Sequence, residues 1–443
     1  MEREVERNPS SPGSTRRQFL SAGLGVVGLA AASPLLSACK GSSGGGASGS
    51  SAGTLKIGFV SPRTGPAAGF GEPDAYVLGL ARKAFENGIE VGGKRYSVVV
   101  IDKDGQSDPA RGAAVANDLI HSDQVDLMLT TSTPETTNPV SDACEAAGIP
   151  CVSTVVPWEA WYFGRGAKPG QPSPFTFTYH FCFGVQQFAN AYTTMWPQVP
   201  TNKKVGVMWP NDADGNAIRA SLGPLLEKAG YTIVDPGAYA DGTNDYSAQI
   251  AKFKAEDCQI FNTFPIPPDF ATFWQQASQQ GYKPKIAQIA KTGLFPSQVE
   301  ALGATGEGLA SGEYWGPTWP YTSTLTNIKA ADLASGYETQ SSKEWNQQLG
   351  PSMALFDVAN ALFKASSNPK DKQAVAKTMA SLSVDTVIGK LEWGKGPVAN
   401  VVATPIIGGQ WVKGSKYPLD FVVVENSNDP NVPVAATLQP YGA

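Results

Sequence analysis

Leu-Lys-Ile-Gly-Phe-Val, residues 55–60, is a short apolar run of the kind that forms a buried strand. A loop rich in Pro, Gly and Ala follows at residues 61–71, and apolar residues then recur at helical spacing from Leu78 to Ile89. This spacing places the apolar side chains on one face of a helix. The segment therefore predicts a strand, a loop and an amphipathic helix that extends to Ile89.

The same unit recurs along most of the chain. Further apolar runs that predict strands lie at 96–101, 125–129, 149–154, 204–209, 231–234, 258–264 and 285–290. Strands that alternate with helices predict parallel sheets covered on both faces. We expect an α/β fold with two doubly wound parallel-sheet lobes in series, joined by a multi-strand hinge. A late helix with Leu355, Val358 and Leu362 has no strand partner of its own, so the chain is expected to cross back to the first lobe.

The first residues have the layout of a bacterial export signal. Arg16-Arg17 precedes an apolar stretch of about 15 residues, which is shorter than the ~20 that span a bilayer. The paired arginines resemble the twin-arginine signal. Leu36-Ser-Ala-Cys39 looks like a lipobox, in which Cys39 carries the lipid, and the Gly- and Ser-rich residues 41–53 follow as a tether. We expect an exported protein, anchored by lipid to the outer face of the cytoplasmic membrane.

These patterns together predict the domain boundaries. The expected parts are a signal peptide at 1–38, a lipidated Cys and tether at 39–53, an N-terminal lobe at 54–176 and 316–385, a C-terminal lobe at 177–315 and 386–425, and a tail at 426–443.

Composition excludes several classes of function. The 443 residues carry 34 Lys and Arg against 39 Asp and Glu, without a basic run, so nucleic acid is not an expected partner. Two His leave little for a catalytic or metal cluster, and neither a metal nor a cofactor is expected. Four cysteines remain besides Cys39, and the sequence leaves both disulfides and buried free thiols open. They are Cys144, Cys151, Cys182 and Cys258.

Ligands of open parallel sheets bind beyond the carboxyl ends of the strands. The residues at those ends resemble the periplasmic solute-binding proteins of the branched-chain amino acid type, the receptors of ABC importers. The resemblance rests on the segments 61–66, 138–142, 211–215 and 245–247, and it covers nearly all of residues 54–425. It implies the periplasmic binding protein type I fold and ligand capture by closure of two lobes.

The resemblance also implies ligand contacts in the first lobe. Thr131, Ser132 and Thr133 fall where the family holds the ligand's carboxylate with hydroxyls and backbone amides, and a polar loop that caps the next helix is the alternative. Ser153 and Thr154 fall where further contacts occur. Trp158 opens a Trp-rich insertion, 158–163, that either shapes the pocket or packs against a lobe.

In the second lobe the sequence departs from the family. Relatives that bind amino acids carry an acidic residue at the position of Lys291, and a buried lysine there favours a carboxylate over an ammonium. Asp212 and Asp214 are alternative acidic partners, so amino acids remain open as ligands, and solvated surface roles remain open for all three charges. Phe70 and Phe264 lie at loops facing the cleft, where aromatic walls suit a planar or apolar ligand body.

The expected function is that of an extracytoplasmic solute-binding lipoprotein. It captures a small amino acid-like or carboxylate solute, aromatic ones included, and delivers it to the transmembrane subunits of an ABC permease. No catalytic residue is expected: a literal G-x-S-x-G at 41–45 lies in the tether, where a nucleophile elbow cannot form. The alternatives are a secreted α/β enzyme and a ligand-sensing lipoprotein without a transporter.

Overall fold

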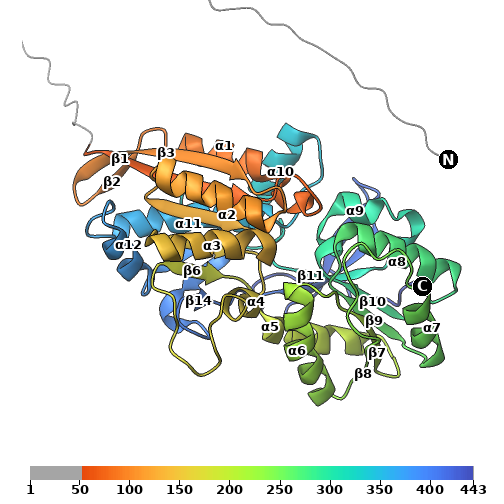
Figure 1. Ribbon diagram of the computed structural model, residues 1–443. Helices are drawn as coiled ribbons and strands as arrows, with labels where there is room; N and C mark the ends of the chain where they lie inside the picture. The colour runs from red at the N-terminus through yellow and green to blue at the C-terminus, as the bar shows by residue number, and fades with distance from the viewer. Residues whose placement is uncertain (1–51, 443) are drawn as a thin grey trace, which may run out of the picture. The chain divides into compact units, whose positions relative to one another are not determined.

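The computed structural model describes residues 52–442, which form two seven-stranded sheets with helices around them (Figure 1). The first sheet has the order β14-β6-β5-β4-β1-β3-β2, and all its neighbouring strands are parallel except the β2–β3 pair. The strands in that order are β14 (Val401–Val402), β6 (Thr178–Phe181), β5 (Cys151–Thr154), β4 (Leu127–Thr131), β1 (Thr54–Ser61), β3 (Lys94–Asp104) and β2 (Ile89–Val91).

The second sheet has the order β16-β15-β11-β10-β9-β7-β8. Its strands from β11 to β8 are parallel, whereas β15 runs antiparallel to both of its neighbours. The strands are β16 (Leu419–Glu425), β15 (Ile407–Lys413), β11 (Ala310–Glu313), β10 (Ile286–Ile289), β9 (Ile260–Thr263), β7 (Lys204–Met208) and β8 (Thr232–Val234). A separate hairpin pairs β12 (Ser383–Thr386) with β13 (Gly389–Glu392). The expected α/β class with two parallel-dominated sheets is confirmed.

Helices alternate with the strands along the chain and pack on the two sheets. The first lobe carries α1 (Asp74–Ala84), α2 (Pro109–Asn117), α3 (Pro134–Ala147) and α4 (Trp158–Tyr162); the second carries α5 (Val185–Met195), α6 (Ala213–Lys228), α7 (Ser247–Ala255), α8 (Pro267–Gln279) and α9 (Pro296–Glu300) (Figure 1). Short single turns complete the loops, among them η1 (Ala68–Gly71) and η4 (Lys291–Leu294). None of the helices within residues 52–442 has both the length and the apolar character of a membrane span.

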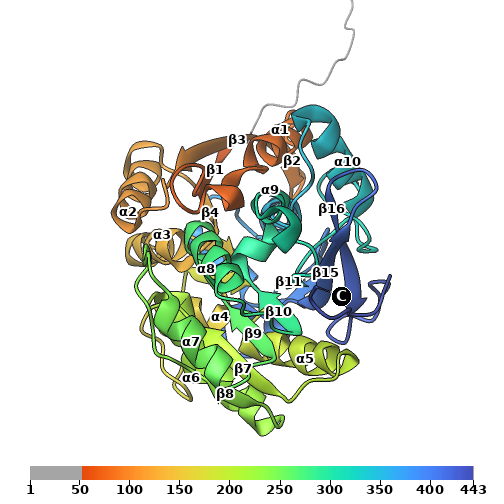
Figure 2. The ribbon, with the colours of Figure 1, turned by 90° about the vertical axis from the view of Figure 1, so that its right-hand side faces the viewer.

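The chain crosses back to the first lobe after β11, as the lone late helix predicted. Three helices follow that crossing, α10 (Ala330–Ser341), α11 (Leu349–Ala365) and α12 (Lys372–Met379). The long α11 packs against α1, β2, β4 and β5 of the first lobe. Figure 2 shows α10 beside the end of the second sheet, where Lys416 Nζ lies 2.6 Å from Glu338 Oε2.

Two local features differ from the expectation. The first helix ends at Ala84, and Ile89 begins β2, because the turn at Gly88 has a φ of +67° and a Cβ there would meet the carbonyl oxygen of Tyr96. The chain also stays with the first sheet beyond residue 386, since β14 pairs with β6 and the second sheet resumes only at β15. The four cysteines at 144, 151, 182 and 258 are all buried free thiols.

Candidate functional site

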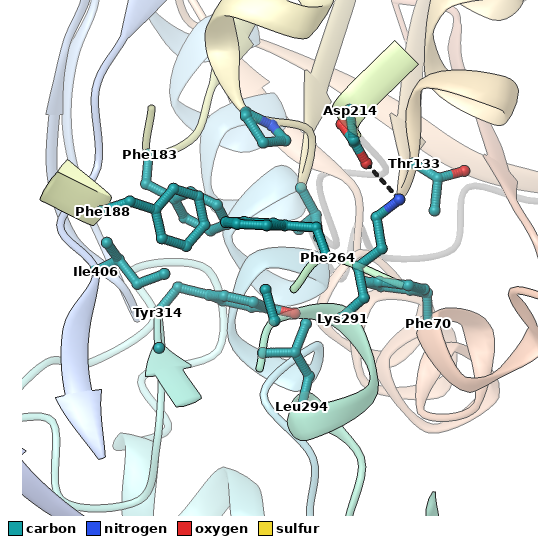
Figure 3. A pocket seen from close by; sticks show the side chains of 14 residues that line it. Phe70, Thr133, Phe183, Phe188, Asp214, Phe264, Lys291, Leu294, Tyr314 and Ile406 are labelled. Atoms are coloured by element: carbon teal, nitrogen blue, oxygen red, sulfur yellow. Dashed lines mark ion pairs between the residues drawn. The ribbon is translucent and has the colours of Figure 1, made fainter. Parts of the chain in front are cut away.

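A pocket lies where the carboxyl ends of strands from both sheets meet (Figure 3). The first lobe contributes residues from η1 and from the loops after β4, β5 and β6, and the second contributes residues that follow β7, β9, β10 and β11. The lining residues are Phe70, Thr133, Val155, Pro157, Phe183, Phe188, Asp214, Phe264, Ala290, Lys291, Leu294, Gly312, Tyr314 and Ile406. We call this cavity the inner pocket.

Aromatic rings form most of the inner pocket's wall, and they are held by contacts with one another. Phe183 stacks on Tyr314 with ring centroids 5.4 Å apart and meets the edge of Phe188 at 5.0 Å. Phe188 in turn meets Phe264 at 5.1 Å in an edge-to-face contact (Figure 3). Such pairs fix ring orientation, so the wall is already shaped to receive a planar or apolar ligand body.

The polar end of the inner pocket is a cluster of one lysine and two aspartates. Lys291 Nζ lies 3.0 Å from Asp212 Oδ2 and 2.9 Å from Asp214 Oδ2, and Figure 3 shows Lys291 and Asp214 facing each other. Asp212 is the N-cap of α6 and also accepts a hydrogen bond from the backbone N–H of Gly215. The two aspartates belong to the start of one helix, and Lys291 opens the turn after β10, so the parallel arrangement of β7 and β10 brings the three together.

Burial sets the protonation of this cluster. Burial raises the pKa of Asp214 to about 6, while the Lys291 ammonium acts in the opposite direction. Burial alone disfavours the charged form of Lys291, but the carboxylates of Asp214, Asp212 and Glu135 raise its pKa well above the ordinary value. Lys291 is therefore a cation whose charge is already matched by buried carboxylates.

One oxygen of this cluster is unused. Asp214 is 3% exposed, and its Oδ1 has no hydrogen-bond partner among residues 52–442. A buried carboxylate oxygen without a donor is costly, so the pocket is suited to a ligand that supplies an N–H or O–H at this point.

Strained backbone also gathers at the site. Thr133, Val155 and Lys291 line the inner pocket with φ values of +63°, +57° and +48°. These residues follow β4, β5 and β10, respectively, and left-handed conformations are unfavourable for side chains of these types. Strain of this sort is tolerated mostly where function demands a particular backbone geometry.

A second pocket, the outer chamber, adjoins the inner pocket. The two share Phe70, Thr133 and Lys291. The other residues that line the outer chamber are Pro66, Ala67, Ser107, Glu135, Asp212, Asp241, Ile266 and Pro267. Its lining therefore includes three carboxylates and one ammonium.

The predicted ligand residues fall into two groups. Those that line one or both cavities are Phe70, Thr133, Asp212, Asp214, Phe264 and Lys291. The others, which line neither cavity, are Thr131, Ser132, Ser153, Thr154 and Trp158.

The residues of the second group have partners inside the protein. Thr131 Oγ1 accepts a hydrogen bond from Gln348 and is 2.7 Å from Ser132 Oγ. Ser153 Oγ is 2.8 Å from a ring nitrogen of His180, and Thr154 donates to the carbonyl of Phe181. Trp158 packs against Tyr162 and Phe163 within the insertion.

Several lining residues were not predicted from the sequence. Tyr314 and Phe183 follow β11 and β6, whose ends point to the cleft like those of the other parallel strands. The strand-end rule applied to these two strands would have found them. Glu135 and Asp241 lie in the first turn of a helix and in a long loop, where nothing in the sequence distinguishes them from solvated acids. Arg16, Arg17 and Cys39 lie outside the described residues.

Comparison with known proteins agrees with this architecture. Residues 54–416 match the family model described as periplasmic binding protein. Leu/Ile/Val-binding protein homolog 3 of Brucella melitensis is 24% identical over 353 residues, which cover 76% of this chain and 87% of that protein.

Solved structures share the fold at low sequence identity. The branched-chain amino acid transporter substrate binding protein LivJ of Streptococcus pneumoniae, in complex with isoleucine, superimposes with a TM-score of 0.64 at 16% identity, covering 84% of this chain and 99% of that one. A solute binding protein of an ABC transporter from R. palustris, in complex with 4-hydroxybenzoate, gives 0.68 at 15%, covering 85% and 98%. These relatives are substrate-binding proteins and not enzymes. With most of its length matched by the family model, the chain belongs to the periplasmic binding protein family.

Proposed function

We propose that this protein is an exported lipoprotein that captures a small solute and delivers it to the transmembrane subunits of an ABC importer. Support for the anchor comes from the sequence, in which Arg16-Arg17 precedes an apolar stretch and Cys39 follows Leu-Ser-Ala. The Gly- and Ser-rich residues 41–53 would let the binding domain move relative to the membrane.

The solute we propose is amino acid-like, with an apolar or aromatic body and a head group that donates hydrogen bonds. The observation that carries this proposal is the unpartnered Asp214 Oδ1 at the polar end of an otherwise aromatic pocket. Lys291 and Thr133 line the same end, so a carboxylate on the same head group would also find donors. An amino acid offers both groups, whereas a simple aromatic acid leaves Asp214 without a donor.

Capture would work by a shift between open and closed forms. Phe70, Thr133 and Val155 come from the first lobe, and Asp214, Phe264 and Lys291 come from the second. A solute can contact both sets only when the lobes are close, so it stabilises the closed form in proportion to its preference for that form. The permease would then recognise the closed, loaded protein.

A ligand screen tests the choice of solute. Residues 54–443 would be titrated by calorimetry with L-phenylalanine, L-leucine and 4-hydroxybenzoate at pH 5 and pH 8. We expect the amino acids to bind more weakly at pH 5 than at pH 8, because Asp214 must be ionised to meet an ammonium and its pKa is about 6. Asp214→Asn should weaken them by about tenfold at pH 8, the size of one lost charge-assisted hydrogen bond. Asp245→Asn, on an exposed carboxylate outside both cavities, is the matched control.

The pH dependence separates the two solute classes. A solute with a carboxylate alone needs Asp214 to take up a proton, and the pKa of Asp214 is raised only to about 6. Its binding should therefore be stronger at pH 5 than at pH 8. Tight binding of 4-hydroxybenzoate at pH 8, together with no binding of either amino acid, would contradict the amino acid-like solute.

The anchor is tested separately in cells. Cys39→Ala should release the protein from the membrane fraction, and replacement of both Arg16 and Arg17 by Lys should reduce its export. Labelling with a radioactive fatty acid that persists in Cys39→Ala would show that another residue carries the lipid.

A further inference from the structure

The outer chamber carries more negative charge than the Lys291 cluster explains. Asp212 is engaged by Lys291 and by the start of α6. The side chains of Glu135 and Asp241 line the same chamber, one from each lobe, and neither forms a hydrogen bond or a close ion pair with another described residue, although the Lys291 ammonium acts on both through space. Lys291 is the only basic residue in the chamber's lining. The lining is therefore net negative, and two of its carboxylates are free to meet a cation.

A second observation indicates that a ligand belongs at this boundary. Thr133 is 7% exposed, lines both cavities, and has a hydroxyl without a hydrogen-bond partner among residues 52–442. On the inner side, Asp214 Oδ1 is fully buried and has no hydrogen-bond partner among the described residues. A molecule that spans the boundary would satisfy both groups, because the two cavities meet at Thr133 and Lys291.

The geometry also fixes the direction of such a molecule. The aromatic wall lies in the inner pocket, and the unpaired acids lie beyond the polar end of that pocket. An apolar side chain would occupy the inner pocket, the head group would lie at Asp214, Lys291 and Thr133, and any extension of the head group would enter the outer chamber. Net negative charge in the chamber favours a positively charged extension and disfavours an anionic one.

We propose, on the basis of the function proposed above, that the solute is a dipeptide-like or amino acid amide compound whose extension carries a positive charge between Glu135 and Asp241. Single aliphatic amino acids would fill the inner pocket only and leave the outer chamber to water. The two carboxylates thus act as specificity-determining residues, since they select the extension and do not hold the head group.

The test compares two dipeptides that differ by one amino group. Phenylalanyl-lysine carries the cation, and phenylalanyl-norleucine has the same side-chain carbons without it. Both are used as C-terminal amides, so that neither brings a carboxylate into the chamber. Calorimetry at pH 7.5 should show that phenylalanyl-lysine binds about fivefold to tenfold more tightly, the size that two partly exposed ion pairs produce. The difference should shrink as salt rises from 20 mM to 500 mM, because salt screens such pairs (Debye length about 3 Å at 1 M and 30 Å at 0.01 M).

Variants of the two acidic residues test whether the outer chamber causes the tighter binding of phenylalanyl-lysine. Glu135→Gln with Asp241→Asn should abolish the difference between the two dipeptides, because phenylalanyl-lysine then loses both partners of its ammonium. The control pair Glu86→Gln with Glu227→Gln removes two exposed carboxylates that line neither cavity, and it should retain the preference. Melting curves of each variant establish that it is folded.

Other outcomes have distinct meanings. Equal affinity for both dipeptides, or a preference that survives the double variant, overturns the cationic extension while the binding function stands. Binding of L-phenylalanine but of neither dipeptide also overturns it, because the chamber then admits no extension. If neither dipeptide nor any of the simple solutes binds, the proposed solute class falls together with this inference.

Discussion

A single residue, Lys291, shows how far a buried charge depends on its neighbours. The sequence presents it as a lysine at the end of a strand, which predicts attraction of an anionic ligand. In the structure its ammonium lies within 3.0 Å of the carboxylates of the buried Asp214 and the partly buried Asp212, so its charge is compensated inside the protein. The residue then serves chiefly to hold Asp212 and Asp214 together, and the carboxylates determine the sign of the site.

Lys291→Met tests this role by its effect on stability. Removal of the ammonium leaves two carboxylates buried without a counter-ion, and we expect a loss of about 3 kcal/mol in the free energy of unfolding at pH 7.5. The loss should be smaller at pH 5, because Asp214, with a pKa of about 6, can take up a proton there. Urea unfolding measures both values. Lys413→Met, at an exposed strand end, is the control, and an equal effect of the two variants would contradict the compensation.

Only part of the site could be predicted from single residues. Phe70, Thr133, Phe264 and Lys291 were found because each follows a predicted strand, and a strand end is visible in a sequence. Thr154 also lies at the end of a predicted strand, but its hydroxyl donates a hydrogen bond to the carbonyl of Phe181 on the neighbouring strand and does not line the pocket. The rotamer that makes this contact depends on groups that only the folded structure brings close. The position of a residue at a strand end therefore does not predict which way its side chain points or which group it contacts.

Among the elements, α4 links the pocket to the connection between the lobes. Glu159 Oε1 accepts a hydrogen bond from the backbone N–H of Val185 at the start of α5, and the backbone N–H of Trp158 donates to the carbonyl of Phe183. Pro157, which directly precedes α4, lines the inner pocket. The insertion thus holds the crossover from β6 to α5 against the pocket wall.

Gly184→Ala tests this contact. A Cβ at Gly184 would overlap the indole of Trp158 and the carboxylate of Glu159, so we expect α4 to be displaced, with a loss of about 2 kcal/mol in stability and weaker solute binding. Gly79→Ala is the matched control, because a Cβ there meets no atom within 4 Å, and alanine in the middle of α1 should stabilise the protein slightly. Equal behaviour of the two variants in melting and binding assays would refute the role given to α4.

Periodicity predicted the long elements better than the short ones. Apolar runs such as residues 204–209 gave strands within a residue or two, because a buried parallel strand needs apolar side chains on both faces. Ile89, the first residue of β2, was assigned to the preceding helix, because the turn at Gly88 that separates the two depends on a backbone conformation that apolar spacing does not reveal. The strand β14 is two residues long and is defined by its partner β6, which no local pattern reveals.

On the scale of the whole molecule, both lobes bury carboxyl groups without matching cations. Asp74 and Asp357 lie in the first lobe and accept hydrogen bonds from Ser352 and Ser323, respectively, while Glu313 at the second crossover accepts one from Trp319. Glu159 lies at the first crossover. Burial raises the pKa of all four groups to about 7. The fold therefore takes up protons at several places when the pH falls below neutrality.

This property predicts a protein that is more stable in mild acid than in mild base. A carboxyl whose pKa is raised in the folded state binds more protons folded than unfolded, so stability is present at low pH and is lost as the pH rises from about 4 to about 7. His180 acts in the opposite sense, because burial lowers its pKa to about 3 and its contribution is lost as the pH falls from about 6.5. Four groups outweigh one, and we expect the melting temperature at pH 5.5 to exceed that at pH 8 by about 5 °C. Calorimetric scans across this range measure it, and Asp74→Asn with Asp357→Asn should reduce the difference. A melting temperature that rises steadily from pH 5.5 to pH 8 would mean that these carboxyls are ionised in the fold and paired by groups that move to meet them.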